Sequence, residues 1–497
     1  MSAPEPELPA GWEWCALEDV AEVRLGRQRS PKNHFGPNMV PYLRAGNVTW
    51  DGLDLTDVNE MQFTPEEVQR YALQRGDILL AEASGSASEV GKPAIWRGEM
   101  ETVCFQNTLI RVRSDGPLPE YLMLVLREAA LSGRFGKAAL GVGINHLGQE
   151  RLARWRIPLA PLEVQGVMVA EVERLLSVTS DGNDAVATGR KLVRALRRAV
   201  LAAAFTGRLV RTQKNSPAFD VGTLEDQRRA RWAHEQGSRP YKQPAQPVEL
   251  PDAFPSHWPV VSLEQATDPN RVICYGILKP KVKGQGTVPY VEVKDLRARQ
   301  LSVGGLHKTT KKLHDEFKRS MLAEGDVVLA IRGSYDCAAI VPSSLAGANI
   351  SRDVARLAPL SGVSTEFLYH YLTSPVAQRY LDARARGVAV KGVNIGHLRE
   401  MPLPLPSADE QLLIVRTLEA QLASIDSFEQ ALGSAALQGR ALVRAILASA
   451  LVGAISFPFD GSTATAADLL ERIKEERQVV KSQRDSAKKR RAVGAAA

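Results

Sequence analysis

The chain has 497 residues, 44% of them hydrophobic and 24% charged, which is ordinary for a globular protein but too long for one hydrophobic core. Its formal net charge of +7 permits a nucleic-acid partner without requiring one. The four cysteines form no CxxC pair, the N-terminus has no signal-peptide pattern, and no apolar run is long enough to cross a bilayer. We therefore expect a cytoplasmic protein of two or more domains, without disulfides, a zinc site or a membrane partner.

The sequence repeats itself at a separation of 246 residues. Trp12 in the segment GWEWCALED returns as Trp258 in SHWPVVSLEQ, and the segment that ends at Gln165 returns with its end at Gln411. Between these anchors the separation stretches to 248 or 249 residues. Loops tolerate insertions better than packed elements do. Each repeat is therefore predicted to have a loop-variable head followed by a scaffold of fixed length.

The heads are predicted to be α+β. Short apolar runs that follow a Gly-Asp pair predict buried strands, and two apolar segments further along predict short helices. These strands and helices are Gly76–Ala81, Tyr121–Ala130, Gly325–Ile331 and Phe367–Thr373. We place head 1 at residues 1–160 and head 2 at residues 255–406.

The scaffold is predicted to be helical at residues 161–236 and 407–480, because apolar residues recur there in steps of three and four. Gly207 and Gly453 mark helix ends, and Ser180–Asp184 is expected to interrupt the first copy. Such stripes ordinarily form intramolecular core, which an antiparallel coiled coil between the two copies would satisfy. Helices of about 20 to 30 residues would separate the heads by about 30 to 45 Å, close to one turn of B-DNA. A linker is expected at 237–254 and a basic, disordered tail at 481–497.

The sequence has no recognisable catalytic pattern. It lacks GxxxxGK[ST], the [DN]PP[YF] motif of amino-methyltransferases, and any metal-ligand spacing among its eight histidines. The glycine-rich GVGIN at Gly141–Asn145 follows no strand and opens no helix, which disfavours a cofactor loop.

Polar and basic side chains recur at matched places in the two heads. A single such loop is ordinarily just solvated, but a matched pair favours binding, since cations on loops suit phosphates, and Asn, Arg and Lys suit base edges. The candidate DNA-binding residues of head 1 are Arg24, Arg27, Arg29, Lys32, Arg44, Asn47, Ser84, Ser86, Lys92, Asn145 and His146. Those of head 2 are Lys279, Lys281, Lys283, Lys294, Arg332, Ser334, Tyr335, Lys391 and Asn394.

The segments LPAGWEWCALEDVAEVRLG, VPYLRAGNV, RGDILLA, IPLAPLEVQ and AFTGRLV, with the INHL loop, together resemble the specificity subunit of type I restriction–modification systems. The resemblance covers nearly the whole chain. It implies two target-recognition domains, each reading one half of a bipartite, asymmetric site in double-stranded DNA, on helices that pair antiparallel and set the unread spacer. The second copy departs from the pattern, with Leu451 in place of Phe205.

The same resemblance implies partners and cofactors. Two modification subunits would carry S-adenosylmethionine and methylate adenine, and they would recruit restriction subunits that use ATP and Mg²⁺. This chain would then be a non-catalytic subunit without a cofactor of its own. Two alternatives stay open: a self-sufficient methyltransferase or nuclease with the same heads, and a duplicated scaffold that binds only protein.

Overall fold

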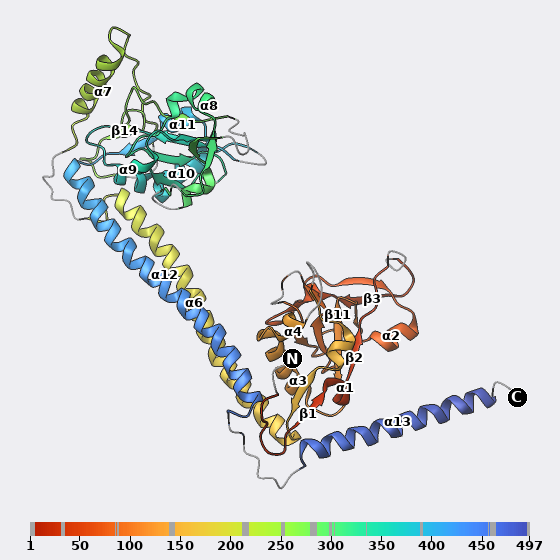
Figure 1. The fold of residues 1–497 in the computed structure, drawn as a ribbon. Helices are drawn as coiled ribbons and strands as arrows, with labels where there is room; N and C mark the ends of the chain where they lie inside the picture. Colours follow the sequence, from red (N-terminus) through yellow and green to blue (C-terminus); the bar gives the residue numbers. More distant parts are fainter. Residues whose placement is uncertain are drawn as a thin grey trace. The chain divides into compact units, whose positions relative to one another are not determined.

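The computed structural model divides the chain into two compact units, Met1–Val186 with Ser434–Ala497, and Ala187–Gly433. Unit 1 contains head 1 and unit 2 contains head 2, and each unit holds part of each long helix (Figure 1 shows the elements). The structure describes residues 5–494 with the exception of 31–34, 85, 87–88, 139–144, 211–217, 250–253, 279–285, 298–300, 303, 334, 388–390, 456 and 458–463.

Head 1 is built on two small sheets. The central strand of the larger sheet is a continuous buried run, as expected for a strand covered on both faces. In spatial order this antiparallel sheet contains β2 (Ala21–Leu25), β11 (Leu109–Ser114), β7 (Ile78–Ala81) and β9 (Pro93–Ile95). The smaller sheet contains β10 (Cys104–Phe105), β3 (Met39–Leu43) and β6 (Asn59–Gln62). Helix α3 (Pro119–Leu131) buries one face against the larger sheet.

Head 2 repeats both sheets in the same strand order. Its larger sheet contains β15 (Cys274–Tyr275), β21 (Val354–Leu357), β18 (Val327–Ala330) and β19 (Ala338–Ile340). Its smaller sheet contains β20 (Asn349–Ile350), β16 (Val288–Val291) and β17 (His307–Thr309), and α9 (Thr365–Leu372) corresponds to α3. The predicted strands and short helices of both heads are thus confirmed.

A strand at the beginning of each head pairs with a strand at its end. In head 1, β1 (Glu13–Ala16) lies antiparallel to β13 (Arg156–Leu159). In head 2, β14 (Val260–Ser262) pairs in the same way with β22 (Pro402–Pro404). Each head therefore closes on itself before the chain enters its long helix.

The scaffold consists of two helices of equal length that lie side by side, α6 (Leu162–Phe205) and α12 (Ala408–Leu451), each of 44 residues (Figure 1). The expected break at Ser180–Asp184 is wrong, since α6 runs through it. In unit 1 this stretch packs on α12, with Asn183 close enough to Gly439 to leave no room for a Cβ. At 1.5 Å per residue each helix is about 66 Å long. The estimate of 20 to 30 residues was too short, and a separation of one DNA turn no longer follows from it.

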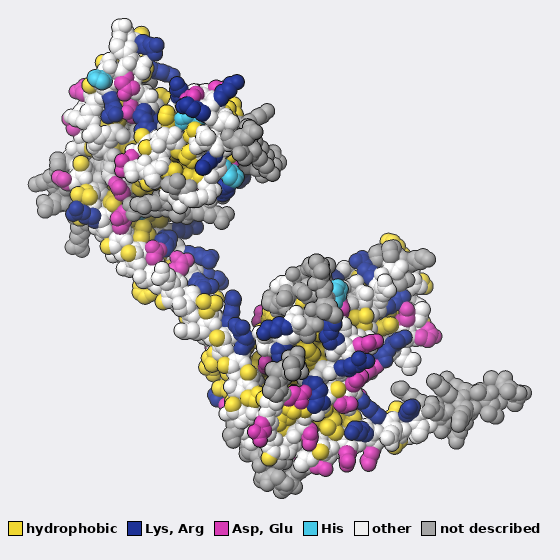
Figure 2. Space-filling model, in the orientation of Figure 1, with side chains coloured by type: hydrophobic (Ala, Val, Ile, Leu, Met, Phe, Trp, Pro, Cys, Tyr) yellow, Lys and Arg dark blue, Asp and Glu magenta, His cyan; other side chains and the backbone are white. Residues whose placement is uncertain are grey.

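The helices also meet in unit 2, where Arg197 forms ion pairs with Asp426 and Glu429 of α12. Hydrophobic side chains remain exposed along the helix pair (Figure 2). They include Val167, Val178, Leu437 and Leu442 in unit 1, and Leu192, Leu196, Leu413 and Phe428 in unit 2. Only some of the apolar residues of the scaffold are therefore buried between the two helices, and the others face solvent.

A buried glutamine joins each head to its helix. The side chain of Gln165 accepts a hydrogen bond from Leu118 N (2.8 Å) and donates one to Ala160 O (2.8 Å). The side chain of Gln411 accepts from Ser364 N (2.8 Å) and donates to Pro406 O (2.9 Å). Each of the three residues in the second set lies 246 positions after its counterpart in the first. The constant separation found in the sequence therefore reflects this joint.

The end of each long helix completes the head of the other repeat. Phe205, at the end of α6, packs edge-to-face on Phe367 and Tyr371 in the core of head 2. Its counterpart Leu451 is buried in the core of unit 1. Beyond them, Gly207 and Gly453 have positive φ angles (71° and 73°) and lie against Pro255 and Pro9. The equivalent core position is therefore filled by a phenylalanine in unit 2 and by a leucine in unit 1.

Two further helices follow the same exchange. Helix α7 (Val221–Gln236) docks on head 2, where the buried Arg228 donates to the carbonyl oxygens of Glu264 and Thr267. Helix α13 (Ala466–Gly494) docks on head 1, where Arg477 donates to Glu18 O (2.7 Å). The predicted disordered tail is wrong as far as Gly494, because α13 continues to that residue.

A buried arginine lies on the inner strand next to β7 or β18 in each larger sheet: Arg111 on β11 and Arg356 on β21. Arg111 forms an ion pair with Glu22 (2.5 Å), whereas Arg356 donates to the carbonyl oxygens of Val272 (2.8 Å) and Met321 (3.3 Å). Burial lowers the pKa of both guanidinium groups. The two heads thus accommodate the same buried cation with different partners.

Candidate nucleic-acid interface

Two of the predicted loops meet in each head. In head 1 the loop after β7 and the segment before α5 (Gln149–Ala153) pair as β8 (Ala83–Ser84) and β12 (Asn145–His146). In head 2, at the matching place, Arg332 forms a β-bridge with Gly392, and Gly333 N donates to Lys391 O (3.0 Å). The sequence identified these loops separately, and the structure brings them together at one edge of each head.

The side chains at these paired loops differ between the heads. His146 is half exposed and approaches Glu82, with 3.0 Å between Nδ1 and Oε2. Arg332 is 55% exposed and only distantly paired with Asp353 (3.7 Å), and Lys391 is exposed. Ser86 is also exposed. The side chains of Ser84 and Asn145, and residue Ser334, lie outside the described residues.

Tyr335 lies next to the paired loops of head 2, where its hydroxyl donates to Asp382 Oδ1 (2.7 Å). This hydrogen bond to a carboxylate raises the pKa of the Tyr335 hydroxyl. Asn394, expected in the loop, instead caps α11 (Ile395–Arg399) by accepting from Gly396 N (3.0 Å). The Oδ1 atom of the Asn394 side chain therefore already accepts a hydrogen bond within the fold.

The first basic loop of head 1 is partly strand. Arg24 lies in β2 and pairs with Glu22, with 2.8 Å between Nε and Oε1. Arg27 is only 13% exposed and bonds Glu67 Oε1 and Gln62 O at 2.8 and 2.7 Å. The expectation that Arg24 and Arg27 extend from a flexible loop is therefore wrong. Arg29 is exposed, and Lys32, Lys279, Lys281 and Lys283 lie outside the described residues.

Two more candidates stabilise the fold around them. Asn47 is buried, with its amide nitrogen donating to Asp54 O and Asp57 O (both 2.9 Å) and its oxygen accepting from Arg44 N (3.0 Å). The Arg44 guanidinium pairs with Asp57. Both N–H donors of the buried Asn47 amide are therefore used within the fold, so this side chain has no donor left for a base.

Lys92 and Lys294 are both engaged in ion pairs. Lys92 pairs with Glu89 (2.7 Å), and the hydrogen bonds from Lys92 and Trp50 lower the pKa of the Glu89 carboxyl. In head 2, Lys294 pairs with Glu292 (2.9 Å) and is about half exposed. Lys294 is therefore the more accessible of the two for a phosphate.

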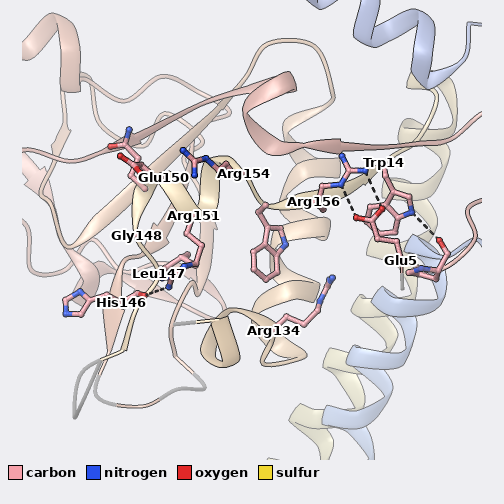
Figure 3. Close-up of a pocket in the computed structure, with 13 residues that line it drawn as sticks. Glu5, Trp14, Arg134, His146, Leu147, Gly148, Glu150, Arg151, Arg154 and Arg156 are labelled. Atoms are coloured by element: carbon pink, nitrogen blue, oxygen red, sulfur yellow. Dashed lines mark hydrogen bonds and ion pairs between the residues drawn. The ribbon is translucent and has the colours of Figure 1, made fainter. Parts of the chain in front are cut away.

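An arginine-lined hollow in head 1 was missed at the level of the sequence (Figure 3). It has a volume of about 1150 Å³, and its polar lining includes Arg134, Arg151, Arg154 and Arg156 beside Trp14. Burial lowers the pKa of Arg134, whereas a hydrogen bond to Glu5 raises that of Arg156. The run ERLARWR carried the signal, since it places three arginines within six residues.

In the described part of the chain, no His, Cys, Asp and Glu side chains cluster as metal ligands. None of the helices described is long and apolar enough to cross a membrane.

A duplicated α/β head on a paired-helix scaffold, with paired loops that differ between the copies, defines a modular recognition protein. The chain matches the family model described as "Type I restriction modification DNA specificity domain" over residues 9–183 and 275–432. It therefore belongs to the family of type I restriction–modification specificity subunits, and its heads are DNA-recognition domains of that family.

The similarity to known proteins extends over most of their length. The type I restriction enzyme EcoBI specificity subunit of Escherichia coli is 28% identical over 359 residues, 70% of either chain. The StySPI specificity subunit of Salmonella potsdam is 22% identical over 97% of this chain and 99% of its own. A solved chain described as "Structural basis underlying complex assembly and conformational transition of the type I R-M system" matches with a TM-score of 0.60 and 18% identity, over 90% of this chain and 99% of its own.

Proposed function

We propose that each head reads one half of a bipartite, asymmetric site in double-stranded DNA. The observation that carries this proposal is the contrast within the duplication. The joint between head and helix is the same in both copies down to the atoms of Gln165 and Gln411. The paired loops at the edge of the sheet carry different side chains, with His146 in one head and Arg332 and Lys391 in the other. A fixed frame with two different loop pairs suits two unrelated half-sites.

The accessible side chains divide by chemistry. The guanidinium of Arg332 can bind guanine bidentately in the major groove, and Ser86 and His146 can exchange hydrogen bonds with base edges. Lys294, Lys391 and Arg29 suit phosphates, as do Lys32, Lys279, Lys281 and Lys283. Arg332→Ala should cost about 1–3 kcal/mol at one base pair, whereas Lys391→Ala should weaken all sequences alike. Binding titrations on a panel of single-base variants would separate these two outcomes.

An exchange of heads tests the proposal that each head recognises its half-site independently of the other. Residues 9–160 are replaced by the corresponding head of another family member, and the methylated motif of the host genome is sequenced. We expect one half of the motif to change while the other half stays as it was. The reciprocal exchange of residues 255–406 is the matched control and should change only the other half. A change in both halves after either exchange would contradict the proposal.

We propose further that the helices set the length of the unread spacer. Seven residues inserted at the same level of α6 and α12 would keep the apolar stripe in phase and add about 10 Å. At about 3.4 Å per base pair, the spacer should then grow by about three base pairs, with both half-sites unchanged. An unchanged spacer in a folded, active complex would refute this role.

We also propose that the chain docks two modification subunits and, through them, the restriction subunits. Exposed apolar residues of the scaffold recur at matched positions: Val167 with Leu413, and Leu196 with Leu442. Unit 1 holds one member of each pair, and unit 2 holds the other. Two equivalent sets of exposed apolar side chains suit two copies of one partner. In unit 1 an apolar groove of about 680 Å³ between Val178 and Leu442 adds room for a partner side chain.

Native mass spectrometry tests this stoichiometry. Leu196→Asp with Leu413→Asp should remove one modification subunit, and Val167→Asp with Leu442→Asp should remove the other. The substituted positions are solvent-exposed, so the free chain should keep its thermal stability. A complex that still holds two modification subunits with either pair of changes would contradict the proposal.

The chain itself is proposed to be non-catalytic, with S-adenosylmethionine, ATP and Mg²⁺ bound by its partners. Its sequence contains neither [DN]PP[YF] nor a phosphate loop. Incubation of the isolated chain with DNA and labelled S-adenosylmethionine should give no methyl transfer, and addition of modification subunits should restore it. Transfer by the chain alone would favour the self-sufficient enzyme instead.

A further inference from the structure

The arginine-lined hollow of head 1 is part of a longer groove. A second hollow of about 280 Å³ lies beside it and begins at Glu18. The two share Gln149, Glu150 and Arg154 as lining residues. Together they form a groove that leads from Glu18 past Arg154 to Trp14, along the closing strands of the head.

Head 2 carries a peptide segment over the same surface. Residues 241–249 follow α7 and run along the head, where Ala245 N donates to Glu264 Oε2 (2.9 Å) and Val248 N donates to Glu400 O (3.2 Å). The residues that lie 246 positions earlier than these two acceptors are Glu18 and Arg154. Both line the groove of head 1. Head 1 therefore presents a carboxylate and a backbone carbonyl where head 2 uses them to hold an extended peptide.

The chain does not supply an equivalent peptide from α13. In unit 2, Gly237 ends α7 with a positive φ of 62°, and the chain then turns back toward residues 241–249. The corresponding part of α13 remains helical, up to Gly494. Among the described residues, Glu5 and Pro6 line the far end of the groove, while Arg151 and Arg154 lie beyond them (Figure 3).

The occupied end of the groove shows what kind of peptide it accepts. The Glu5 carboxylate receives hydrogen bonds from Arg156 (2.9 and 3.4 Å), and the Trp14 indole N–H donates to Pro6 O (3.2 Å). An acidic residue followed by proline is thus already bound there. The counterparts of Arg151, Arg154 and Arg156 in head 2 are His397, Glu400 and Pro402, so these three arginines belong to head 1 alone.

We propose that the groove of head 1 binds an extended, acidic, proline-containing segment of a partner protein. The arginines select carboxylates, and the Arg154 carbonyl and the Glu18 carboxylate accept backbone N–H groups as their counterparts do in head 2. A nucleic-acid backbone has no N–H donors for these two acceptors, and Glu18 and Glu150 repel phosphates. Both observations favour a peptide over DNA. The inference goes beyond the proposed reading of DNA and does not depend on it.

A labelled nine-residue peptide provides the test. It has the sequence of residues 241–249 with Lys242, Gln243 and Gln246 replaced by Glu, and its binding to the full-length chain is followed by fluorescence anisotropy. Arg151→Glu with Arg154→Glu should weaken binding about tenfold or more, since each lost contact is a charge-assisted hydrogen bond. The unmodified sequence 241–249 should bind the original chain more weakly than the acidic peptide.

The controls distinguish specific peptide binding from a general effect of charge, from unfolding of head 1 and from binding of nucleic acid. Arg174→Glu, on an exposed face of α6, should leave peptide binding unchanged, and Arg154→Lys should retain most of it. Exchange protection of β2 and β11 should be the same in all variants, which shows that head 1 still folds. The proposal is overturned if the original chain does not bind the acidic peptide at about 1 mM. It is equally overturned if Arg154→Glu leaves peptide binding intact while abolishing the binding of duplex DNA.

Discussion

Arg271→Ala should destabilise head 2 selectively. Asp326 is 1% exposed, and its carboxylate is held by both terminal nitrogens of Arg271, at 2.7 and 2.6 Å, and by Ala323 N at 2.8 Å. Removing one partner of a buried pair costs about 3–5 kcal/mol, because the remaining charge is left unpaired. We expect about 3 kcal/mol, at the lower end, because Arg271 is 30% exposed and Asp326 keeps a backbone hydrogen bond.

The structure of head 1 indicates a second substitution that should restore the stability of head 2. There the corresponding Asp77 is held by Arg113 of β11, at 2.7 Å for both bonds, and the position of Arg113 corresponds to Ala358 in head 2. The corresponding aspartate is thus bound by an arginine from β11 in head 1 and by an arginine from the segment before β15 in head 2. Arg271→Ala combined with Ala358→Arg should recover most of the lost stability, as the arrangement of head 1 is rebuilt in head 2.

Hydrogen exchange read by mass spectrometry separates the heads within one chain. A loss of about 3 kcal/mol should speed exchange of peptides from β18 and β21 by about 100-fold, with β7 and β11 of head 1 unchanged. Arg174→Ala, which breaks an exposed pair with Glu171, should change exchange by less than about threefold. An acceleration below about fivefold in Arg271→Ala, or a failure of Ala358→Arg to reverse it, would refute the reasoning.

Three further predictions concern the joint, the acid response and the thiols. Gln411→Leu should leave the Ser364 N–H and two carbonyl oxygens without partners and cost head 2 about 2–4 kcal/mol, measured by urea denaturation, with head 1 as the internal reference. Although burial opposes it, the hydrogen bond from Arg24 and the charge of Arg111 lower the pKa of Glu22 below its ordinary value of 4.5. Its contribution is therefore complete above about pH 4.5 and is lost as the pH falls through the folded pKa, so Glu22→Gln should flatten the loss of head 1 stability between about pH 5 and 3. Burial raises the pKa of Cys15 and Cys104 to about 12 and also raises that of Cys274, so the half-exposed Cys337 should react first with Ellman's reagent and Cys337→Ser should remove the fast phase.

The sequence predicted the duplication and the Gly-Asp strands because each depends on local pattern and spacing. It failed at Ser180–Asp184, where weak helix formers favoured a break. In the structure α12 packs along this stretch, and tertiary contact outweighs propensity there. The helices were consequently judged too short, although their equal length followed from the constant spacing of 246 residues.

The candidate contacts were predicted less well than the fold. Arg27 and Asn47 have the right chemistry for DNA, but only the folded chain shows that Glu67 and the carbonyl oxygens of Asp54 and Asp57 occupy them. Residue type and spacing do not reveal which polar groups a protein uses internally. The groove of head 1 was missed because its arginines come from several elements: α4 (Arg134–Ala138), α5, the residue that follows α5, and β13.

The ends of α6 and α12 have a consequence for shorter chains. Phe205 and α7 of the first repeat complete head 2, while Leu451 and α13 of the second repeat complete head 1. The chain is in this sense domain-swapped with itself. A polypeptide that contained only one repeat would expose the core surface meant for its missing neighbour, yet it would carry the element that another copy lacks. Such half-length chains should therefore associate in pairs and present one head twice, which turns an asymmetric reader into a symmetric one.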